Sequence, residues 1–160
     1  MSRTNIHATG LVLGTTGVIL RGPSGAGKSL LALSLIEAWE ARGRKAMLVS
    51  DDRIDIERTA SGLVMHAPAA IAGLIELRGR GIVRRPHRAR APIHLVVDLV
   101  PQLERMVEEE ALTTALEGVS LARCPVPKIG ITELGHQQLL VFEALRALST
   151  GKAGRGKKTA

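Results

Sequence analysis

One segment near the start of the chain has the composition of a phosphate-binding loop. It fits the pattern G-x-x-x-x-G-K-S/T and consists of Gly22, Pro23, Ser24, Gly25, Ala26, Gly27, Lys28 and Ser29. Glycines let backbone N–H groups curve around an anion, and a helix that begins at the loop points its unpaired N–H groups and its dipole at the phosphates. The pattern predicts that Lys28 reaches the β- and γ-phosphates of a nucleotide such as ATP and that Ser29 offers a hydroxyl to Mg²⁺. The alternative is a glycine-rich turn in front of an ordinary helix.

Two adjacent aspartates, Asp51 and Asp52, follow the apolar run at residues 46–50. In open α/β sheets the carboxyl ends of the strands face the ligand crevice, so a carboxylate there can hold Mg²⁺ or accept a proton from a nucleophile. Successive strand residues point to opposite faces, so we expect different roles for the two. One would act as a base and the other would support the metal or the loop. For either residue alone, a role as a helix or turn cap is the alternative.

Three further side chains could join this chemistry. Glu76 and Arg78 alternate with apolar residues in the segment 72–83 and would share one face of a strand. They could form a solvent-exposed ion pair, or they could contact phosphate and metal. His7 lies on the first predicted strand, shortly before the phosphate-binding loop, where a structural role is its alternative.

Strands and helices must bring these residues together, and the apolar pattern predicts where they lie. A helix is expected at 28–42, with apolar residues three or four apart, and Gly43 is expected to end it. Segment 101–119 reads as partly helical, and a closing helix is expected at 134–149. Strands are predicted at 5–13, 18–21, 46–50 and 91–100, with a hairpin formed by 53–57 and 62–66. This succession indicates a single α/β domain with a mixed β-sheet.

Composition limits the classes of protein that remain. The 160 residues suit one domain, which we place at 5–149, and 45% of them are hydrophobic. A single cysteine fits a reducing compartment, and we see neither a secretory signal nor a membrane span, so we expect a cytoplasmic protein. The net charge of +7 arises partly from residues 150–160, a Gly- and Lys-rich segment that we expect to be a disordered basic tail. A second basic cluster runs from Arg80 to Arg90 and could attract an acidic partner or form a solvated face.

Taken together, these motifs resemble the catalytic C-terminal domain of HPr kinase/phosphorylase. The resemblance rests on His7-Ala8, on GPSGAGKS, and on the segments VSDDRIDI (49–56), LIELRGRGIV (74–83) and CPVPKIGI (124–131). It covers roughly residues 5–145, and the E-x-R-G segment followed by G-I is the most discriminating part. The chain resembles a short form without the N-terminal domain of longer members, and after Lys128 it reads ITELGH where the family usually has a G-R-N stretch.

The resemblance implies a fold like that of HPr kinase and PEP carboxykinase, with ATP and Mg²⁺ as cofactors and a serine of the phosphocarrier protein HPr as acceptor. It implies that Asp51 takes the serine proton and returns it in phosphorolysis, with Asp52 as its partner. His7 resembles the family's histidine near the phosphates, and Arg105 matches a later arginine of a mobile loop. Glu76 and Arg78 resemble the signature pair, and the implied metal ligands are Ser29, Asp52 and Glu76. Family members assemble as hexamers, so a homo-oligomer is expected.

Two other functions are compatible with the same phosphate cradle. A small-molecule kinase would consume ATP with a metabolite and need no protein acceptor, whereas a nucleotide sensor would bind ATP without transferring phosphate. Nucleic-acid binding rests only on net charge, and a chain with one Trp, one Phe and no Tyr lacks the aromatic platforms on which bases stack. We therefore expect a phosphotransferase and no nucleic-acid partner.

Overall fold

A six-stranded sheet forms the centre of the computed structural model, which describes residues 2–158. Its strand order is β11-β12-β10-β3-β2-β4. The bounds are β2 (Ala8–Leu13), β3 (Thr16–Arg21), β4 (Ala46–Ser50), β10 (Leu95–Val100), β11 (Thr113–Leu116) and β12 (Val119–Pro127). Strands β3, β10 and β12 run parallel, whereas β2, β4 and β11 pair antiparallel with their neighbours. The predicted α/β architecture with a mixed sheet is confirmed.

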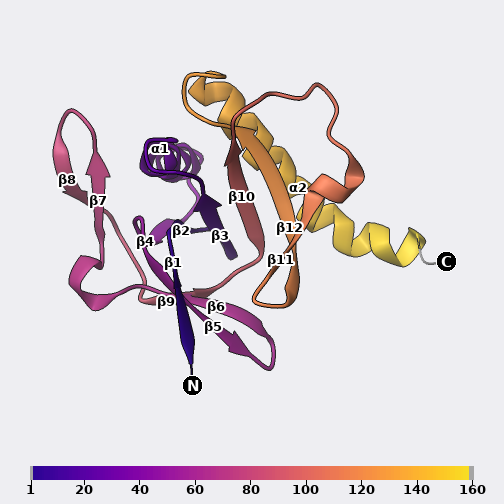
Figure 1. The fold of residues 1–160 in the computed structure, drawn as a ribbon, viewed down its shortest axis with the longest axis horizontal. Helices are drawn as coiled ribbons and strands as arrows, with labels where there is room; N and C mark the ends of the chain where they lie inside the picture. The colour runs from indigo at the N-terminus through magenta and orange to yellow at the C-terminus, as the bar shows by residue number, and fades with distance from the viewer. Residues whose placement is uncertain (1, 159–160) are drawn as a thin grey trace.

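Two helices and two smaller β units surround this sheet (Figure 1). The helices are α1 (Lys28–Ala41) and α2 (Leu134–Lys158), with short 3₁₀ turns η1 (Ala69–Ile71) and η2 (Glu109–Leu112). A four-stranded sheet contains β1 (Arg3–Ile6), β5 (Ile54–Thr59), β6 (Gly62–His66) and β9 (Arg90–Pro92). The hairpin of β7 (Leu74–Leu77) and β8 (Gly81–Arg84) stands beside α1 at the edge of the molecule (Figure 1).

The central sheet is buried on both faces, and every residue of β2 is buried. Leu11 and Leu13 point into the core cluster that α1 and α2 cover, whereas Ala8 and Val12 point into a second cluster shared with the four-stranded sheet. Strands buried on both sides read as continuous apolar runs, which is why the sequence around the phosphate-binding loop is so hydrophobic. The loop therefore leaves a rigid layer at the end of β3.

The few aromatic residues join the two helices. The rings of Trp39 on α1 and Phe142 on α2 lie 5.7 Å apart between centroids, at an interplanar angle of 42°. The guanidinium of Arg42 lies 4.3 Å from the centre of the Phe142 ring, a cation–π arrangement. These contacts fix α1, and with it the end of the loop, against the closing helix.

Several predicted elements are confirmed. Helix α1, strand β4 and the β5–β6 hairpin all lie where the apolar pattern placed them. Gly43 follows α1 with a φ of 74°, a conformation that favours glycine, and its N–H donates to the carbonyl of Glu40.

Other predictions of strands and helices are wrong. The strand expected at 5–13 is divided at His7 into β1 and β2, which belong to different sheets, and the strand expected at 91–100 is divided into β9 and β10 in the same way. Apolar content alone does not show when a chain passes from one sheet to another. Segment 101–119, predicted to be partly helical, contains the 3₁₀ turn η2; the rest of it forms β11, an irregular connection and the first residue of β12. Strand β12 was not predicted.

The closing helix is longer than expected. Helix α2 continues to Lys158, into the segment 150–160 for which the sequence predicts a disordered tail, and residues 159–160 of that segment lie outside the described residues. The domain boundary at 149 stays a prediction. Within residues 2–158, no helix is both long and apolar enough to cross a membrane.

Gly17 on β3 provides a test of how closely the two sheets approach. A Cβ atom at this position would lie 1.6 Å from the carbonyl oxygen of Pro92 on β9. We expect Gly17→Ala to lower the free energy of unfolding by about 3 kcal/mol, because the backbone must move to admit the methyl group. Urea denaturation measures the loss. Gly135→Ala is the control, since its Cβ would meet no atom within 4 Å; equal stability of the two variants would contradict the packing described.

Candidate active site

The phosphate-binding loop connects the end of β3 at Arg21 to the start of α1 at Lys28. Gly25 and Gly27 have φ values of 83° and 94°, which a side chain would strain, so the glycines of the motif are required by the shape of the loop. The backbone N–H of Ile129 donates to the carbonyl of Ala26, and the Ile129 side chain packs against Gly27. The loop is thus held in shape by the connection that follows β12.

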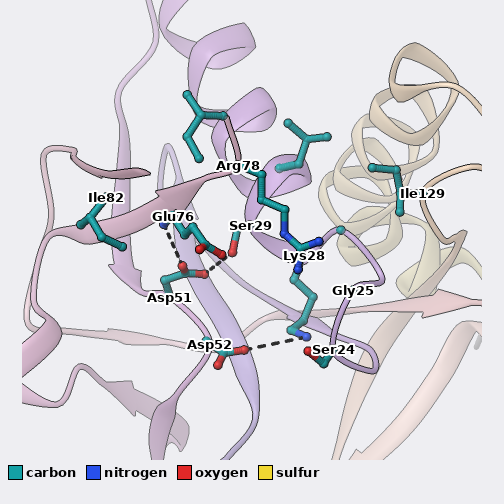
Figure 2. Close-up of a pocket in the computed structure, with 13 residues that line it drawn as sticks. Ser24, Gly25, Lys28, Ser29, Asp51, Asp52, Glu76, Arg78, Ile82 and Ile129 are labelled. Carbon is teal, nitrogen blue, oxygen red and sulfur yellow. Dashed lines mark hydrogen bonds and ion pairs between the residues drawn. The ribbon is translucent and has the colours of Figure 1, made fainter. Parts of the chain in front are cut away.

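The side chain of Lys28 lies inside this loop. Only 5% of it is exposed, and Nζ donates a hydrogen bond to the carbonyl oxygen of Gly22 at 2.8 Å. The Asp52 carboxylate lies 4.0 Å from Nζ (Figure 2). The backbone of the loop therefore positions the ammonium group at the place where the motif predicts a phosphate-binding cation.

Asp51 is the best-anchored carboxylate of the site. Its Oδ1 accepts hydrogen bonds from the hydroxyls of Ser29 at 2.7 Å and Thr9 at 3.0 Å, and its Oδ2 accepts one from the backbone N–H of Glu76 at 3.1 Å. All three donors are neutral, and Asp51 makes no salt bridge with any residue in 2–158. Its negative charge is oriented but not balanced.

Asp52 has a different environment, as expected for two aspartates with different roles. Its backbone φ is 69°, its side chain is 57% exposed, and its carboxylate pairs with Nε2 of His7 and faces Lys28. Its backbone N–H donates to the Thr9 hydroxyl. Strand β4 ends at Ser50, so the contrast between the aspartates arises from the turn after the strand and not from strand alternation.

The hairpin β7–β8 brings Glu76 and Arg78 to the same pocket as the two aspartates, but the two residues do not share one face of a strand. Strand β7 ends at Leu77, so Arg78 belongs to the turn, whereas Glu76 is still on the strand. Figure 2 shows Glu76 beside Ser29 and Asp51, with Arg78 reaching over the loop above Lys28. The geometry does not support an ion pair between the two, since neither makes a salt bridge among the described residues.

These side chains surround a pocket of about 480 Å³. Its lining comprises Ser24, Gly25, Gly27, Lys28, Ser29, Leu30, Asp51, Asp52, Glu76, Leu77, Arg78, Ile82 and Ile129. His7 does not line the pocket, but its side chain pairs with Asp52, which does. Arg105 lies in the connection between β10 and η2 and does not line this pocket, so its membership of the site stays a prediction.

The pocket suits a magnesium nucleotide. The lining presents oxygen donors from Ser29, Asp51, Asp52 and Glu76, which are the hard ligands that Mg²⁺ prefers, beside a buried ammonium group and an open glycine loop. Among residues 2–158 no three His, Cys, Asp or Glu side chains come together as a metal site. Mg²⁺ is usually held by one or two carboxylates together with water and substrate phosphates, so such a cluster is not needed.

Two features of the site were not predicted from the sequence: the role of Thr9, and a cluster of ion pairs around Asp98 that precedes the loop. Thr9 is fully buried, and its hydroxyl links the Asp51 carboxylate to the Asp52 backbone. A hydroxyl inside an otherwise apolar strand that leads to the loop is a signal that could have identified it, because buried polar groups need partners.

The ion cluster consists of Asp98 on β10 between Arg21 on β3 and Arg123 on β12. Arg21 donates two hydrogen bonds to the carboxylate, at 2.8 and 2.9 Å, and Arg123 donates one at 2.6 Å. Burial raises the pKa of Asp98, but the hydrogen bonds from Arg21 and then Arg123 outweigh it and hold the pKa below its usual value. The cluster ties together three parallel strands directly before the loop.

A glycine loop between a parallel strand and a helix, with a lysine inside it and carboxylates beside it, defines a P-loop phosphate-binding domain. The particular family is clear from sequence: the chain belongs to the HPr Serine kinase C-terminal domain family, whose model matches residues 1–153.

Individual relatives agree with this assignment. HPr kinase/phosphorylase of Clostridium acetobutylicum is 32% identical over 152 residues, covering 90% of this chain and 48% of the relative. The enzyme of the same name from Bordetella pertussis is 38% identical over 105 residues, covering 58% of this chain and 32% of the relative. The solved structure of the Hpr(Ser) kinase/phosphatase from Coxiella burnetii has a TM-score of 0.76 and 27% identity, and the match covers 98% of this chain and 96% of that one. The chain spans about half or less of the curated relatives that it matches.

The hydrogen bonds of Thr9 can be tested by amide exchange. We expect Thr9→Val to accelerate hydrogen exchange at the Asp52 N–H roughly tenfold, because that amide loses its acceptor, whereas Thr9→Ser keeps it. The measurement is exchange followed by NMR on the folded protein. The same acceleration in both variants would show that the hydroxyl is not the acceptor that protects Asp52.

The lowered pKa of Asp98 predicts a dependence of stability on pH. At neutral pH, Asp98→Asn should lower the free energy of unfolding by about 2 kcal/mol, because two guanidinium groups lose the anion between them. Because the folded-state pKa is the lower one, this stabilisation is complete above the unfolded value of about 4 and is lost as the pH falls through the folded value.

Urea titrations of the wild type and of Asp98→Asn at a series of pH values check this prediction. The difference in unfolding free energy should shrink below about pH 4. Asp55→Asn is the control, because among residues 2–158 that carboxylate accepts only an exposed hydrogen bond from Asn5. A difference for Asp98→Asn that stays constant down to about pH 2 would contradict the electrostatic origin of the stabilisation.

Proposed function

We propose that this protein transfers the γ-phosphoryl group of ATP to a serine hydroxyl of an HPr-like phosphocarrier protein. The observation that carries the proposal is a single pocket that combines the phosphate-binding loop, Lys28, Arg78 and the anchored carboxylate of Asp51. Membership of the HPr Serine kinase C-terminal domain family and relatives named HPr kinase/phosphorylase support the choice of acceptor.

In the proposed reaction, the serine oxygen attacks the γ-phosphorus, the bond to the ADP oxygen breaks, and the serine proton passes to Asp51. The geometry favours Asp51 for this role because neutral donors orient its carboxylate and no cation among the described residues balances its charge. Lys28 and Arg78 neutralise charge on the transferring group, and His7 and Lys28 flank the carboxylate of Asp52. Catalysis in such transfers is mostly positioning plus electrostatics.

Magnesium would be held by Ser29, Glu76 and Asp52, where it would neutralise phosphate charge. The protonated Asp51 could also serve the reverse direction, in which inorganic phosphate attacks phosphoserine, the serine oxygen takes back the proton, and pyrophosphate leaves. Arg105 would contribute from the connection between β10 and η2. A cytoplasmic location, for which the single cysteine argues, and assembly into a hexamer belong to the same proposal.

The proposal is tested by incubating the protein with γ-labelled ATP, Mg²⁺ and purified HPr and locating the label on a serine. We expect Asp51→Asn to lower the rate of transfer by about 10²–10⁴-fold with nucleotide affinity largely kept, because the variant loses the proton acceptor but not the loop. Lys28→Ala should weaken ATP binding itself, measured by calorimetry.

Asp52→Asn is the matched control, since it makes the same chemical change one residue away. Because Asp52 is also a proposed magnesium ligand, the two variants are compared at saturating Mg²⁺, where a larger loss of rate in Asp52→Asn than in Asp51→Asn would reverse the assignment of the base. Label on a metabolite instead of HPr would indicate a small-molecule kinase, and tight ATP binding without transfer to any acceptor would indicate a nucleotide sensor.

A further inference from the structure

Exposed apolar side chains gather at the mouth of the pocket. Leu30 on α1 is 38% exposed, Ile82 on β8 is 65% exposed, and Ile129 after β12 is 45% exposed. All three line the pocket, although they come from three separate parts of the chain. Single apolar residues on a surface need no explanation, but three of them around one cavity would be covered by a molecule that extends beyond that cavity.

The hairpin β7–β8, which carries Ile82, also carries arginines that form no ion pair among the described residues. Arg78, Arg80 and Arg84 make no salt bridge with any residue in 2–158, whereas the neighbouring Arg85 lies 3.6 Å from Glu37. Arg78 lines the pocket, and Arg80 follows in the exposed turn at the tip of the hairpin. Positive charge therefore continues from inside the pocket onto the surface outside it.

We infer that hairpin β7–β8 is the docking arm for the protein acceptor, with Ile82 as its apolar contact and Arg80 as its charged contact. The inference rests on the proposed function, because it assumes that the hydroxyl to be phosphorylated belongs to a protein. The partner that fits this surface presents carboxylates next to an apolar patch beside its acceptor hydroxyl. An apolar centre with arginine at its edge is the usual composition of a protein interface.

The placement of these side chains favours a protein acceptor over a metabolite. A small acceptor would be enclosed beside the nucleotide in the pocket, where it would touch Arg78 but not the side chain of Arg80 at the tip. Figure 1 shows the hairpin standing out beside α1, so a partner that contacts both Ile82 and Arg80 must extend past the rim. Unpaired arginines there would also speed the approach of an acidic partner and make association sensitive to salt.

Matched pairs of variants test the arm. Ile82→Ala is compared with Leu139→Ala, because Leu139 on α2 is equally exposed at 64%. Arg80→Glu is compared with Arg146→Glu, which makes the same charge change on the exposed surface of α2. Labelled HPr is the probe, and both its binding and its phosphorylation are measured at low and high salt, with ATP affinity determined separately.

We expect the two hairpin variants to weaken HPr binding and to raise the KM for HPr roughly tenfold each, which is the loss typical of an important interface side chain. Arg80→Glu should also flatten the salt dependence and leave ATP affinity as in the wild type, and the two α2 variants should behave as the wild type throughout. Phosphorylation of HPr with unchanged KM in both hairpin variants would overturn the docking arm while leaving the proposed function intact.

The remaining outcomes separate the two proposals as well. Binding of HPr that depends on Arg80 and Ile82 but leads to no phosphate transfer would support the arm and refute the proposed function. A wild-type protein that neither binds nor phosphorylates HPr would overturn both.

Discussion

The Asp51 carboxylate is the junction on which the pocket depends. Its three donors come from β2 through Thr9, from α1 through Ser29, and from β7 through the backbone of Glu76. A partly buried carboxylate must be hydrogen bonded, so the requirement to satisfy this one anion fixes the hairpin relative to the helix and the sheet. The walls of the pocket are therefore held in place by the same group to which we assign the proton transfer.

Rigidity reaches this junction from the central sheet. Strand β3 lies between β10 and β2 and is buried on both faces, so the loop that leaves its end starts from a fixed point. The Asp98 cluster joins β3 to β10 and β12 one residue before the loop, and Ile129 closes the loop from the segment after β12. A cavity that must hold several phosphate oxygens within hydrogen-bond distance needs such support, because displacements of about 1 Å already reduce rates strongly.

Local features of the site could be predicted from the sequence, and features that depend on distant pairing could not. Motifs identified Asp51, Asp52, Glu76 and Arg78, which line one pocket with five of the eight loop residues; Gly22, Pro23 and Ala26 shape the loop but do not line the pocket. The helix that begins at Lys28 also follows from the motif. Segment 91–100 is divided into two strands because β9 pairs with β6 in one sheet and β10 pairs with β3 in another. No residue within the segment indicates this division. Thr9 is intermediate: a hydroxyl in an apolar strand is a local signal of a buried polar contact, but its partners lie in a turn more than forty positions later in the chain.

The charges in the pocket lining explain why this arrangement suits a metal-bound nucleotide better than a free anion. Three carboxylates, Asp51, Asp52 and Glu76, face only two cationic side chains, Lys28 and Arg78. Phosphate groups would add further negative charge beside these carboxylates, and like charges at short distance repel one another. A divalent cation among the carboxylates would remove that repulsion, whereas Arg80 and Arg84 of hairpin β7–β8 do not line the pocket and, in our proposal, meet the charges of the partner. In the proposed function, the surplus of carboxylates inside the pocket and of arginines outside it would separate the binding of the nucleotide from the recognition of the acceptor.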